Sequence, residues 1–175
     1  LDFILTGDGT SPVSTIYRND GNGTFVNILA GIQPLVNSSV AWGDFDNDGD
    51  LDLAIAGEVN QQELSLIYRN DGGGTFTDIQ TGLPGIRRGT VAWGDADNDG
   101  DLDLLLMGAG NGNTITRIYQ NNGNNSFSFL SSADLPNLIL AAGAFGDYDN
   151  DGDLDLLLTG RDSMSVSRSY IYRND

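Results

Sequence analysis

Residues 44–52 read DFDNDGDLD, with five aspartates and one asparagine in nine positions. The string returns as DADNDGDLD at residues 95–103 and as DYDNDGDLD at residues 147–155. Neighbouring carboxylates repel one another, so three such strings call for a compensating positive charge. A bound cation is one source of that charge. The alternative is a solvated turn that binds no metal.

The spacing within each string is typical of a calcium loop. Aspartates at positions 1, 3 and 5 converge on one point, and the glycine at position 6 permits a sharp turn. Position 7 offers its backbone carbonyl, and the aspartate at position 9 closes the shell with its carboxylate oxygens. Six or seven oxygen ligands favour Ca²⁺ over Mg²⁺ and over the softer metals, which prefer nitrogen or sulfur. We therefore expect three Ca²⁺ sites.

The strings belong to a longer module that repeats along the chain. Asp44 and Asp95 are 51 residues apart, and Asp95 and Asp147 are 52 apart. VAWGD precedes the loop at 40–44 and 91–95, and IYRNDG at 16–21 returns at 67–72. We expect a single repeat array, divided into a partial blade, two complete blades and a second partial blade: 1–39, 40–90, 91–142 and 143–175.

Each module divides into four segments typical of β-strands. Val40–Asp44 leads into the acidic string and Leu51–Ala56 leaves it, and Leu64–Arg69 and Thr75–Ile79 follow on either side of a glycine-rich hairpin. No stretch is convincingly helical, because the apolar runs are short and 24 glycines interrupt them. We expect an all-β fold of tandem four-stranded antiparallel blades of a β-propeller, about three and a half blades.

Three smaller features add to this picture. The apolar runs Leu104–Met107 and Leu156–Leu158 predict strands that are covered on both faces. The Asn-Asp-Gly clusters at 19–21 and 70–72 predict hairpin turns, which need residues that tolerate positive φ. Arg87 and Arg88 form the only basic pair, and we expect them to lie in a loop.

The composition excludes several classes of function. With 25 acidic against 8 basic residues, the net charge of −17 disfavours nucleic acid and anionic membrane surfaces as partners. No run approaches the ~20 apolar residues that a membrane-spanning helix needs, so we expect no membrane insertion. Histidine and cysteine are absent, and the only glutamates are Glu58 and Glu63, within one module. We therefore expect a protein that is not an enzyme.

An EF-hand is excluded, since its loop requires a bidentate glutamate at position 12, where this chain has Ile55, Leu106 and Leu158. The motif D-x-D-x-D-G-x-x-D between two strands instead resembles the FG-GAP or VCBS repeat family, the calcium-bearing blades also seen in integrin α-subunit propellers. The resemblance covers the whole chain. It implies three ligand sets, in each of which the fourth residue acts through its backbone: Asp44, Asp46, Asp48, Asp50 and Asp52; Asp95, Asp97, Asp99, Asp101 and Asp103; Asp147, Asp149, Asp151, Asp153 and Asp155.

The phenylalanine-glycine pair of that family is present at Phe145, while Trp42 and Trp93 replace the phenylalanine in the other two copies. These rings stand on the strand that enters the acidic loop. We expect them to pack between blades. The alternative is a platform on which sugars stack.

Two classes of function remain open. The first is an extracellular calcium-binding module with a structural or adhesive role, in which Ca²⁺ makes the blades rigid for protein–protein contacts or for assembly. The alternative is a carbohydrate-binding propeller lectin. Loops of the weaker kind fill at ~10⁻⁴–10⁻³ M calcium, which predicts a secreted or cell-surface location. Sequons at Asn22, Asn37 and Asn124 are compatible with a glycosylated, secreted chain.

The first and last residues of the sequence fall within a module, and this predicts partners for the outermost blades. Leu1 and Asp2 match positions 8 and 9 of an acidic string, and Asp175 falls within a YRNDG turn. A closed seven-bladed propeller of such modules would need roughly 357 residues. We expect flanking repeats or other copies of the chain to cover the open ends, closing a ring or extending a filament. Protein or glycan ligands are further expected partners.

Overall fold

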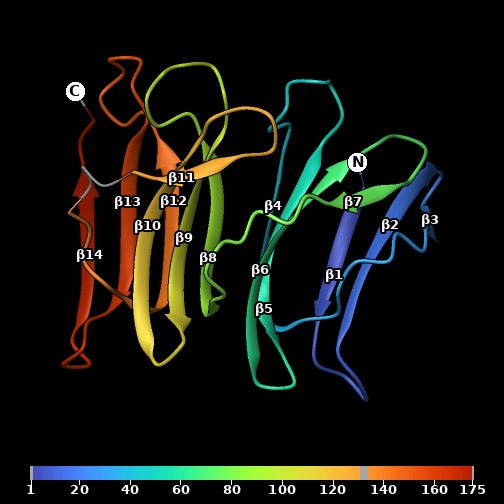
Figure 1. Ribbon diagram of the computed structural model, residues 1–175, viewed down its shortest axis with the longest axis horizontal. Coiled ribbons are helices and arrows are strands. Elements are labelled where there is room, and N and C mark those ends of the chain that lie inside the picture. The colour runs from blue at the N-terminus through green and yellow to red at the C-terminus, as the bar shows by residue number, and fades with distance from the viewer. Residues whose placement is uncertain (1, 131–133, 175) are drawn as a thin grey trace.

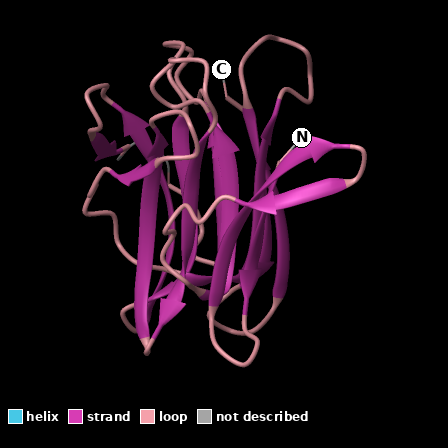
Figure 2. Ribbon diagram, turned by 90° about the vertical axis from the view of Figure 1, so that its right-hand side faces the viewer, coloured by secondary structure: helices cyan, strands magenta, loops and turns pink. Residues whose placement is uncertain are grey.

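The computed structural model describes residues 2–130 and 134–174, which form strands and loops only (Figures 1 and 2). In this part of the chain no helix is long and apolar enough to cross a membrane. The strands form four antiparallel sheets, named blades 1 to 4 in chain order, which stand side by side from blue to red in Figure 1. The expected all-β fold of antiparallel blades is confirmed.

Strand order within every blade follows the chain, because each strand pairs with the next through a short connection. Blades 2 and 3 have four strands each, and the described residues of blades 1 and 4 have three each. Blade 1 contains β1 (Phe3–Gly7), β2 (Val13–Gly21) and β3 (Thr24–Asn27). Blade 2 contains β4 (Val36–Gly43), β5 (Asp52–Val59), β6 (Gln62–Asn70) and β7 (Phe76–Asp78). Blade 3 contains β8 (Arg87–Gly94), β9 (Asp103–Gly110), β10 (Asn113–Asn121) and β11 (Phe127–Phe129). Blade 4 contains β12 (Ile139–Gly146), β13 (Asp155–Arg161) and β14 (Ser167–Tyr172).

The first strand of each complete blade starts earlier than the apolar pattern indicates. β4 begins at Val36, four residues before the expected Val40, and its pairing with β5 shifts register between Val36 and Ser39. Asn37, inside that shift, has a φ of 49°. An extra residue of this kind forms a β-bulge, which breaks the alternation of apolar and polar residues that marks a strand in sequence.

The bulge repeats in the next two blades, where the residues with positive φ are Arg88 (52°) and Leu140 (48°). The expectation that Arg87 and Arg88 lie in a loop is therefore wrong, because both belong to β8. Arg87 forms ion pairs of 3.2 Å with Glu58 and with Glu63 of blade 2. The basic residue thus joins two blades.

Apolar side chains are buried mainly between consecutive blades, in three clusters. Blades 1 and 2 enclose Ile16, Ile32, Leu35, Leu53, Ile55 and Tyr68. Blades 2 and 3 enclose Phe45, Ala54, Ala56, Ile67, Ile86, Val91, Leu104, Leu106 and Tyr119. Blades 3 and 4 enclose Leu105, Met107, Ile118, Leu138, Ala141, Leu156 and Leu158. The fold is therefore a stack in which each blade is stabilised by its neighbours.

Coverage of the central strands on both faces is confirmed in blade 3 and only partly correct in blade 4. Leu104–Met107 on β9 are at most 1% exposed, since blades 2 and 4 lie against opposite faces of this strand. On β13, Leu156 and Leu158 are buried but Leu157 is 45% exposed. The exposure arises because, within the described residues, no sheet lies against that face of blade 4.

The aromatic residues before the second and third acidic strings pack against the glycine of the preceding blade. A Cβ atom on Gly43 would lie 2.6 Å from the Trp93 ring, and one on Gly94 would lie 2.5 Å from the Phe145 ring. The glycines are thus required by close approach between blades, and packing is confirmed as the role of Trp93 and Phe145. Trp42 packs beside the cluster of blades 1 and 2 and also lines a cavity.

Candidate metal centres in the acidic loops

Each acidic string is the loop between the first and second strand of its blade, so all three lie at the same end of the blades (Figure 1). We name them loop 1 (44–52, between β4 and β5), loop 2 (95–103, between β8 and β9) and loop 3 (147–155, between β12 and β13). The antiparallel pairing of those strands fixes both ends of every loop.

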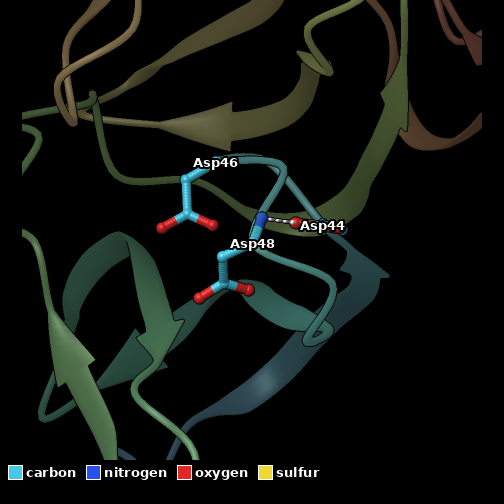
Figure 3. A group of neighbouring side chains, drawn as sticks. All are labelled: Asp44, Asp46 and Asp48. Carbon is cyan, nitrogen blue, oxygen red and sulfur yellow. Dashed lines mark hydrogen bonds between the residues drawn. The ribbon is translucent and has the colours of Figure 1, made fainter.

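The first aspartate organises the turn. In loop 1 the Oδ1 atom of Asp44 accepts a hydrogen bond of 3.0 Å from the Asp48 backbone N–H (Figure 3). Its Oδ2 atom accepts one of 3.0 Å from the Gly49 backbone N–H. Gly49 has a φ of 95°, a conformation that favours glycine. The same pairs of bonds recur at the first aspartates of loops 2 and 3.

Three carboxylates converge in every loop. In each group, one oxygen atom from each residue lies within 4.8 Å of the others. Figure 3 shows the loop 1 group, in which the side chains of Asp46 and Asp48 lie close together. The groups are Asp44, Asp46 and Asp48; Asp95, Asp97 and Asp99; and Asp147, Asp149 and Asp155. An all-oxygen, anionic donor set of this kind fits a hard divalent cation, and the permissive coordination of Ca²⁺ suits it best.

The ninth position contributes a buried aspartate. Asp52 is fully buried, and its Oδ2 and Oδ1 atoms accept hydrogen bonds from the backbone N–H groups of Phe45 (2.9 Å) and Asn70 (2.8 Å). It thereby joins the start of the loop to the third strand. Burial raises the pKa of Asp52 to about 6, although the two hydrogen bonds act in the opposite direction. Each carboxylate oxygen keeps a further lone pair that a cation can use.

Asp103 and Asp155 repeat this arrangement in the other two loops. Both are buried, and burial raises the pKa of Asp103 as it does that of Asp52. Asp103 accepts from Ala96 and Asn121, each at 2.9 Å. Asp155 accepts from Tyr148 at 2.9 Å and from Asn174 at 3.0 Å. Asp2 of blade 1 is exposed, but it accepts the corresponding bond of 2.8 Å from the backbone of Asn19, so the bond to the third-strand asparagine position recurs in all four blades.

The seventh-position aspartates, predicted to use their backbone carbonyls, direct their side chains elsewhere. Asp101 accepts a hydrogen bond of 2.8 Å from the Asn47 side chain, and Asp153 accepts one of 2.6 Å from Asn98. Asp50 has its backbone N–H bonded to Asp48 at 2.8 Å. Two of these three side chains therefore connect neighbouring loops.

A residue on the third strand, or directly after it in blade 4, faces the outer carboxylates of each loop. Arg173 lies 3.4 Å from Asp149 and 3.6 Å from Asp151 in loop 3, whereas Gln120 donates a hydrogen bond to Asp97 in loop 2. In loop 1 burial and the charges of Asp48 and Asp44 raise the pKa of Asp46, and the positive charge of Arg69 opposes this rise without cancelling it. The three loops therefore have aspartates at the same positions but differ in the charge of the residue that faces them.

The chain was compared with known proteins. The model of the FG-GAP-like repeat matches three times, over residues 1–55, 44–106 and 105–158. The chain belongs to the FG-GAP-like repeat family. No curated protein and no solved structure matches it significantly. As an FG-GAP-like chain it has three acidic loops that could hold metal ions, with the aromatic-glycine contact between blades beside them.

The contacts that cross between blades are not indicated by the repeat pattern of the sequence. The Asn-Asp-Gly clusters at 19–21 and 70–72 predict hairpin turns, and the side-chain oxygen of Asn70 does accept from Gly72 at 3.1 Å. Asn121, at the equivalent position of blade 3, accepts from Gly123 at 3.0 Å. The amide group of Asn121 also donates to the backbone oxygen of Phe45 in blade 2, at 2.8 Å. These asparagines recur at equivalent positions of the repeats, which was the one sign of such a contact in the sequence. Because a hairpin turn already explains asparagine at these positions, the recurrence did not point to a contact between blades.

One cavity of about 580 Å³ lies between blades 1 and 2. Its lining includes the rings of Trp42 and Phe76 and the polar groups of Arg18, Asp50 and Asn70. Between blades 2 and 3 the corresponding space holds Phe45 of loop 1, whose ring centroid lies 6.0 Å from that of Trp93 and 5.8 Å from that of Phe127. The cavity is therefore of a size and shape that accepts an aromatic ring.

Proposed function

We propose that this chain is an extracellular calcium-binding repeat module with a structural or adhesive role and no catalytic activity. The observation that carries the proposal is that three carboxylates converge beside a positive-φ glycine in each of the three loops. They come from positions 1, 3 and 5 in loops 1 and 2, and from positions 1, 3 and 9 in loop 3. Each set of carboxylates fits Ca²⁺ and lies at the same place in its blade. The ion supplies the positive charge that the clustered aspartates need.

The bound ion acts by making each blade rigid. The outer carboxylates belong to the loop between the first and second strands, and the ninth aspartate is bonded to the backbone of the third. A cation that draws these groups together therefore restrains three strands at once. The rigid stack then presents a fixed surface to other proteins or to further blades.

The proposal is tested by thermal unfolding in calcium and in excess chelator. Ligand linkage stabilises the folded state by ~2.7 kcal/mol per site at a hundredfold excess over the dissociation constant, so chelator should lower the melting temperature by many degrees. Mg²⁺ should restore it poorly, because it prefers strict octahedral geometry. The triple variant Asp46→Asn, Asp97→Asn, Asp149→Asn should melt at the same temperature with and without calcium. A parent protein whose melting curve is unchanged in excess chelator would refute the proposal.

The expected location follows from affinity. Loops that fill at ~10⁻⁴–10⁻³ M calcium would be occupied outside cells and nearly empty in cytosol. Calorimetric titration of the chain with calcium measures this directly. Sub-micromolar dissociation constants at all three loops would favour a cytosolic buffer or sensor instead.

The proposed partners are further blades, from flanking repeats or from other copies of the chain. The outward face of blade 1 exposes Phe3 (40%), Leu5 (51%) and Phe25 (45%), and that of blade 4 exposes Leu157 (45%) and Ile171 (63%). Within the chain, equivalent faces of blades 2 and 3 bury such residues against each other. Protein or glycan ligands would then bind the completed surface.

A carbohydrate-binding role is the second candidate, supported by the cavity between blades 1 and 2. Aromatic rings beside polar groups are a combination that binds sugars, and Trp42 and Phe76 lie there with Asp50 and Asn70. Screening on a glycan array, with Trp42→Ala as the comparison, tests this role. Binding that Trp42→Ala leaves intact, or no binding at all, would argue against it.

A further inference from the structure

A continuous hydrogen-bond path joins the ninth aspartates of loops 1 and 2. Asp52 accepts from the Phe45 N–H at 2.9 Å, and the Phe45 carbonyl accepts from the side-chain amide of Asn121 at 2.8 Å. The backbone N–H of Asn121 then donates to Asp103 at 2.9 Å. Asn121 is only 2% exposed and both aspartates are buried, so the path runs through the interior between the two blades.

The same path continues from loop 2 to loop 3. Asp103 accepts from the Ala96 N–H at 2.9 Å, and the Ala96 carbonyl accepts from the side-chain amide of Asn174 at 2.9 Å. The backbone N–H of Asn174 donates to Asp155 at 3.0 Å. Loop 2 therefore contacts both of its neighbours, while neither path joins loop 1 directly to loop 3.

A second contact joins adjacent loops at the surface. The side-chain amide of Asn47 donates to Asp101 at 2.8 Å, and that of Asn98 donates to Asp153 at 2.6 Å. Both asparagines have a φ of 59°, the conformation in which the loop turns back on itself. The direction in which these two side chains point depends on the folded shape of the loop. The hydrogen bonds to the next loop therefore depend on that shape too.

We propose that neighbouring calcium loops are energetically coupled across the blade interface, so that filling one loop raises the calcium affinity of the next. Asn121, Asn174, Asn47 and Asn98 are the positioning residues that carry the coupling. The inference rests on the calcium-binding function proposed above. Fixing loop 1 around an ion fixes the Phe45 carbonyl and the Asn47 side chain, which in turn hold Asn121 and Asp101 in the geometry that loop 2 needs.

Electrostatics acts against this coupling. A loaded loop carries two fewer negative charges, so it attracts the next ion less strongly. At physiological ionic strength exposed charges are screened beyond about 8 Å, whereas direct hydrogen bonds between loops are not lost to screening. Screening weakens the electrostatic opposition, and we expect the hydrogen-bonded contacts to outweigh what is left, so that the cooperativity is positive.

The first experiment removes one loop and follows the others. In the variant Asp46→Asn, Asp48→Asn, loop 1 can no longer fill, and the amide NMR signals of Gly100 and Gly152 report calcium binding at loops 2 and 3 separately. We expect the affinity of loop 2 to fall about fivefold or more, as typical coupling free energies imply, while that of loop 3 changes little. Unchanged or increased affinity at loop 2 would overturn the inference.

The second experiment removes a single contact. Asn47→Gly deletes the side chain that reaches Asp101 while keeping a residue that readily adopts positive φ, and it should weaken the coupling between loops 1 and 2. The matched control is Asn150→Gly at the same position of loop 3, where φ is 62° and no further acidic loop follows in the described chain. The control should leave the coupling unchanged.

The outcomes separate the two proposals. Loops that fill independently in the parent protein, or an Asn47→Gly variant that keeps the full coupling, would overturn the inference and leave calcium binding intact. A chain that binds calcium at no loop would overturn the proposed function itself. Cooperative filling that Asn47→Gly weakens and Asn150→Gly preserves is the supporting result.

Discussion

The aspartates of each loop divide into two kinds that differ in burial. Asp46 and Asp48 are exposed and converge with Asp44, so without a cation their carboxylates repel one another, although Asp48 also accepts a hydrogen bond of 2.8 Å from the Asp50 backbone N–H. Asp52 is buried, and two backbone N–H groups hold both of its oxygens. A bound cation would therefore act mainly on the exposed residues, whereas the buried residue supports the fold without one.

This division predicts different effects for the same substitution. Asp52→Asn replaces one acceptor oxygen with a donor that faces a backbone N–H, so it should destabilise the folded state by about 1–3 kcal/mol even in chelator. Asp46→Asn should not lower the free energy of unfolding in chelator, since it removes repulsion. In calcium it should be less stable than the parent protein. Urea unfolding of both variants in the two conditions measures this. Equal losses in chelator would contradict the assignment.

The residue opposite each loop predicts a difference in affinity. Arg173 pairs with Asp149 and Asp151, so a cation entering loop 3 must displace or approach a positive charge. Arg173→Gln, which introduces the residue found at this position beside loop 2, should raise the affinity of loop 3 by about two- to fivefold, the range of exposed ion pairs.

The control for this prediction is Arg168→Gln, since Arg168 pairs with Asp162 at 2.9 Å, outside the acidic loops. Calcium titration followed at the Gly152 amide compares the two variants. An affinity that falls in Arg173→Gln would mean that the arginine assists binding rather than competing with it.

At the scale of the elements, the junction between consecutive blades depends on an aromatic ring lying over a glycine. Phe145 of β12 approaches Gly94 of β8 so closely that a Cβ atom there would lie 2.5 Å from the ring and 2.9 Å from the Phe145 Cβ. The base of a side chain cannot move away without its strand. The two strands are therefore held at a separation that only glycine allows.

Gly94→Ala should accordingly destabilise the protein by roughly 1–3 kcal/mol through overpacking. The matched control is Gly146→Ala, at the same position of β12, where no described atom lies within 4 Å of the added Cβ. Melting in saturating calcium compares the two, and the control should melt like the parent. Similar melting temperatures for both variants would show that the strands can separate enough to accommodate the added Cβ atom, which would contradict the prediction.

At the scale of the whole molecule, stability comes from stacking, because each apolar cluster is shared by two blades. The outward face of blade 4 exposes Leu157 and Ile171, and large exposed apolar surfaces favour association. A heterologous contact between the outward faces of blades 1 and 4 would build a ring if it closes and a filament if it does not.

Leu157→Asp should therefore weaken self-association in calcium while leaving the melting temperature of the monomer nearly unchanged, because the side chain is already 45% exposed. Sedimentation velocity at increasing concentration measures the association. Met164→Asp, at a residue 74% exposed in the turn between β13 and β14, is the control. A parent chain that stays a sharply melting 18.6 kDa monomer at all concentrations would exclude copies of itself as the partner.

Short stretches of the sequence by themselves determine the acidic loops, the strands and the order of the blades. The strings at 44–52, 95–103 and 147–155 predicted the loops, because aspartate spacing and a positive-φ glycine act within nine residues. They also predicted the converging carboxylates of loops 1 and 2, whereas in loop 3 Asp155 takes the place expected for Asp151. Apolar runs bounded by glycine and asparagine predicted the strands for the same reason. The 51- and 52-residue recurrence predicted sequential blades, since each repeated segment folds as its copies do.

The contacts between blades were decided only in the tertiary structure. The Asn121 side chain reaches Phe45 across 76 residues of sequence, and Arg87 turns out to lie in a strand that begins with a bulge and pairs with Glu58 and Glu63. Leu157 is exposed although its two neighbours are buried. These features depend on how one blade is placed against the next, which is set by packing between distant side chains rather than by the order of residues within a module.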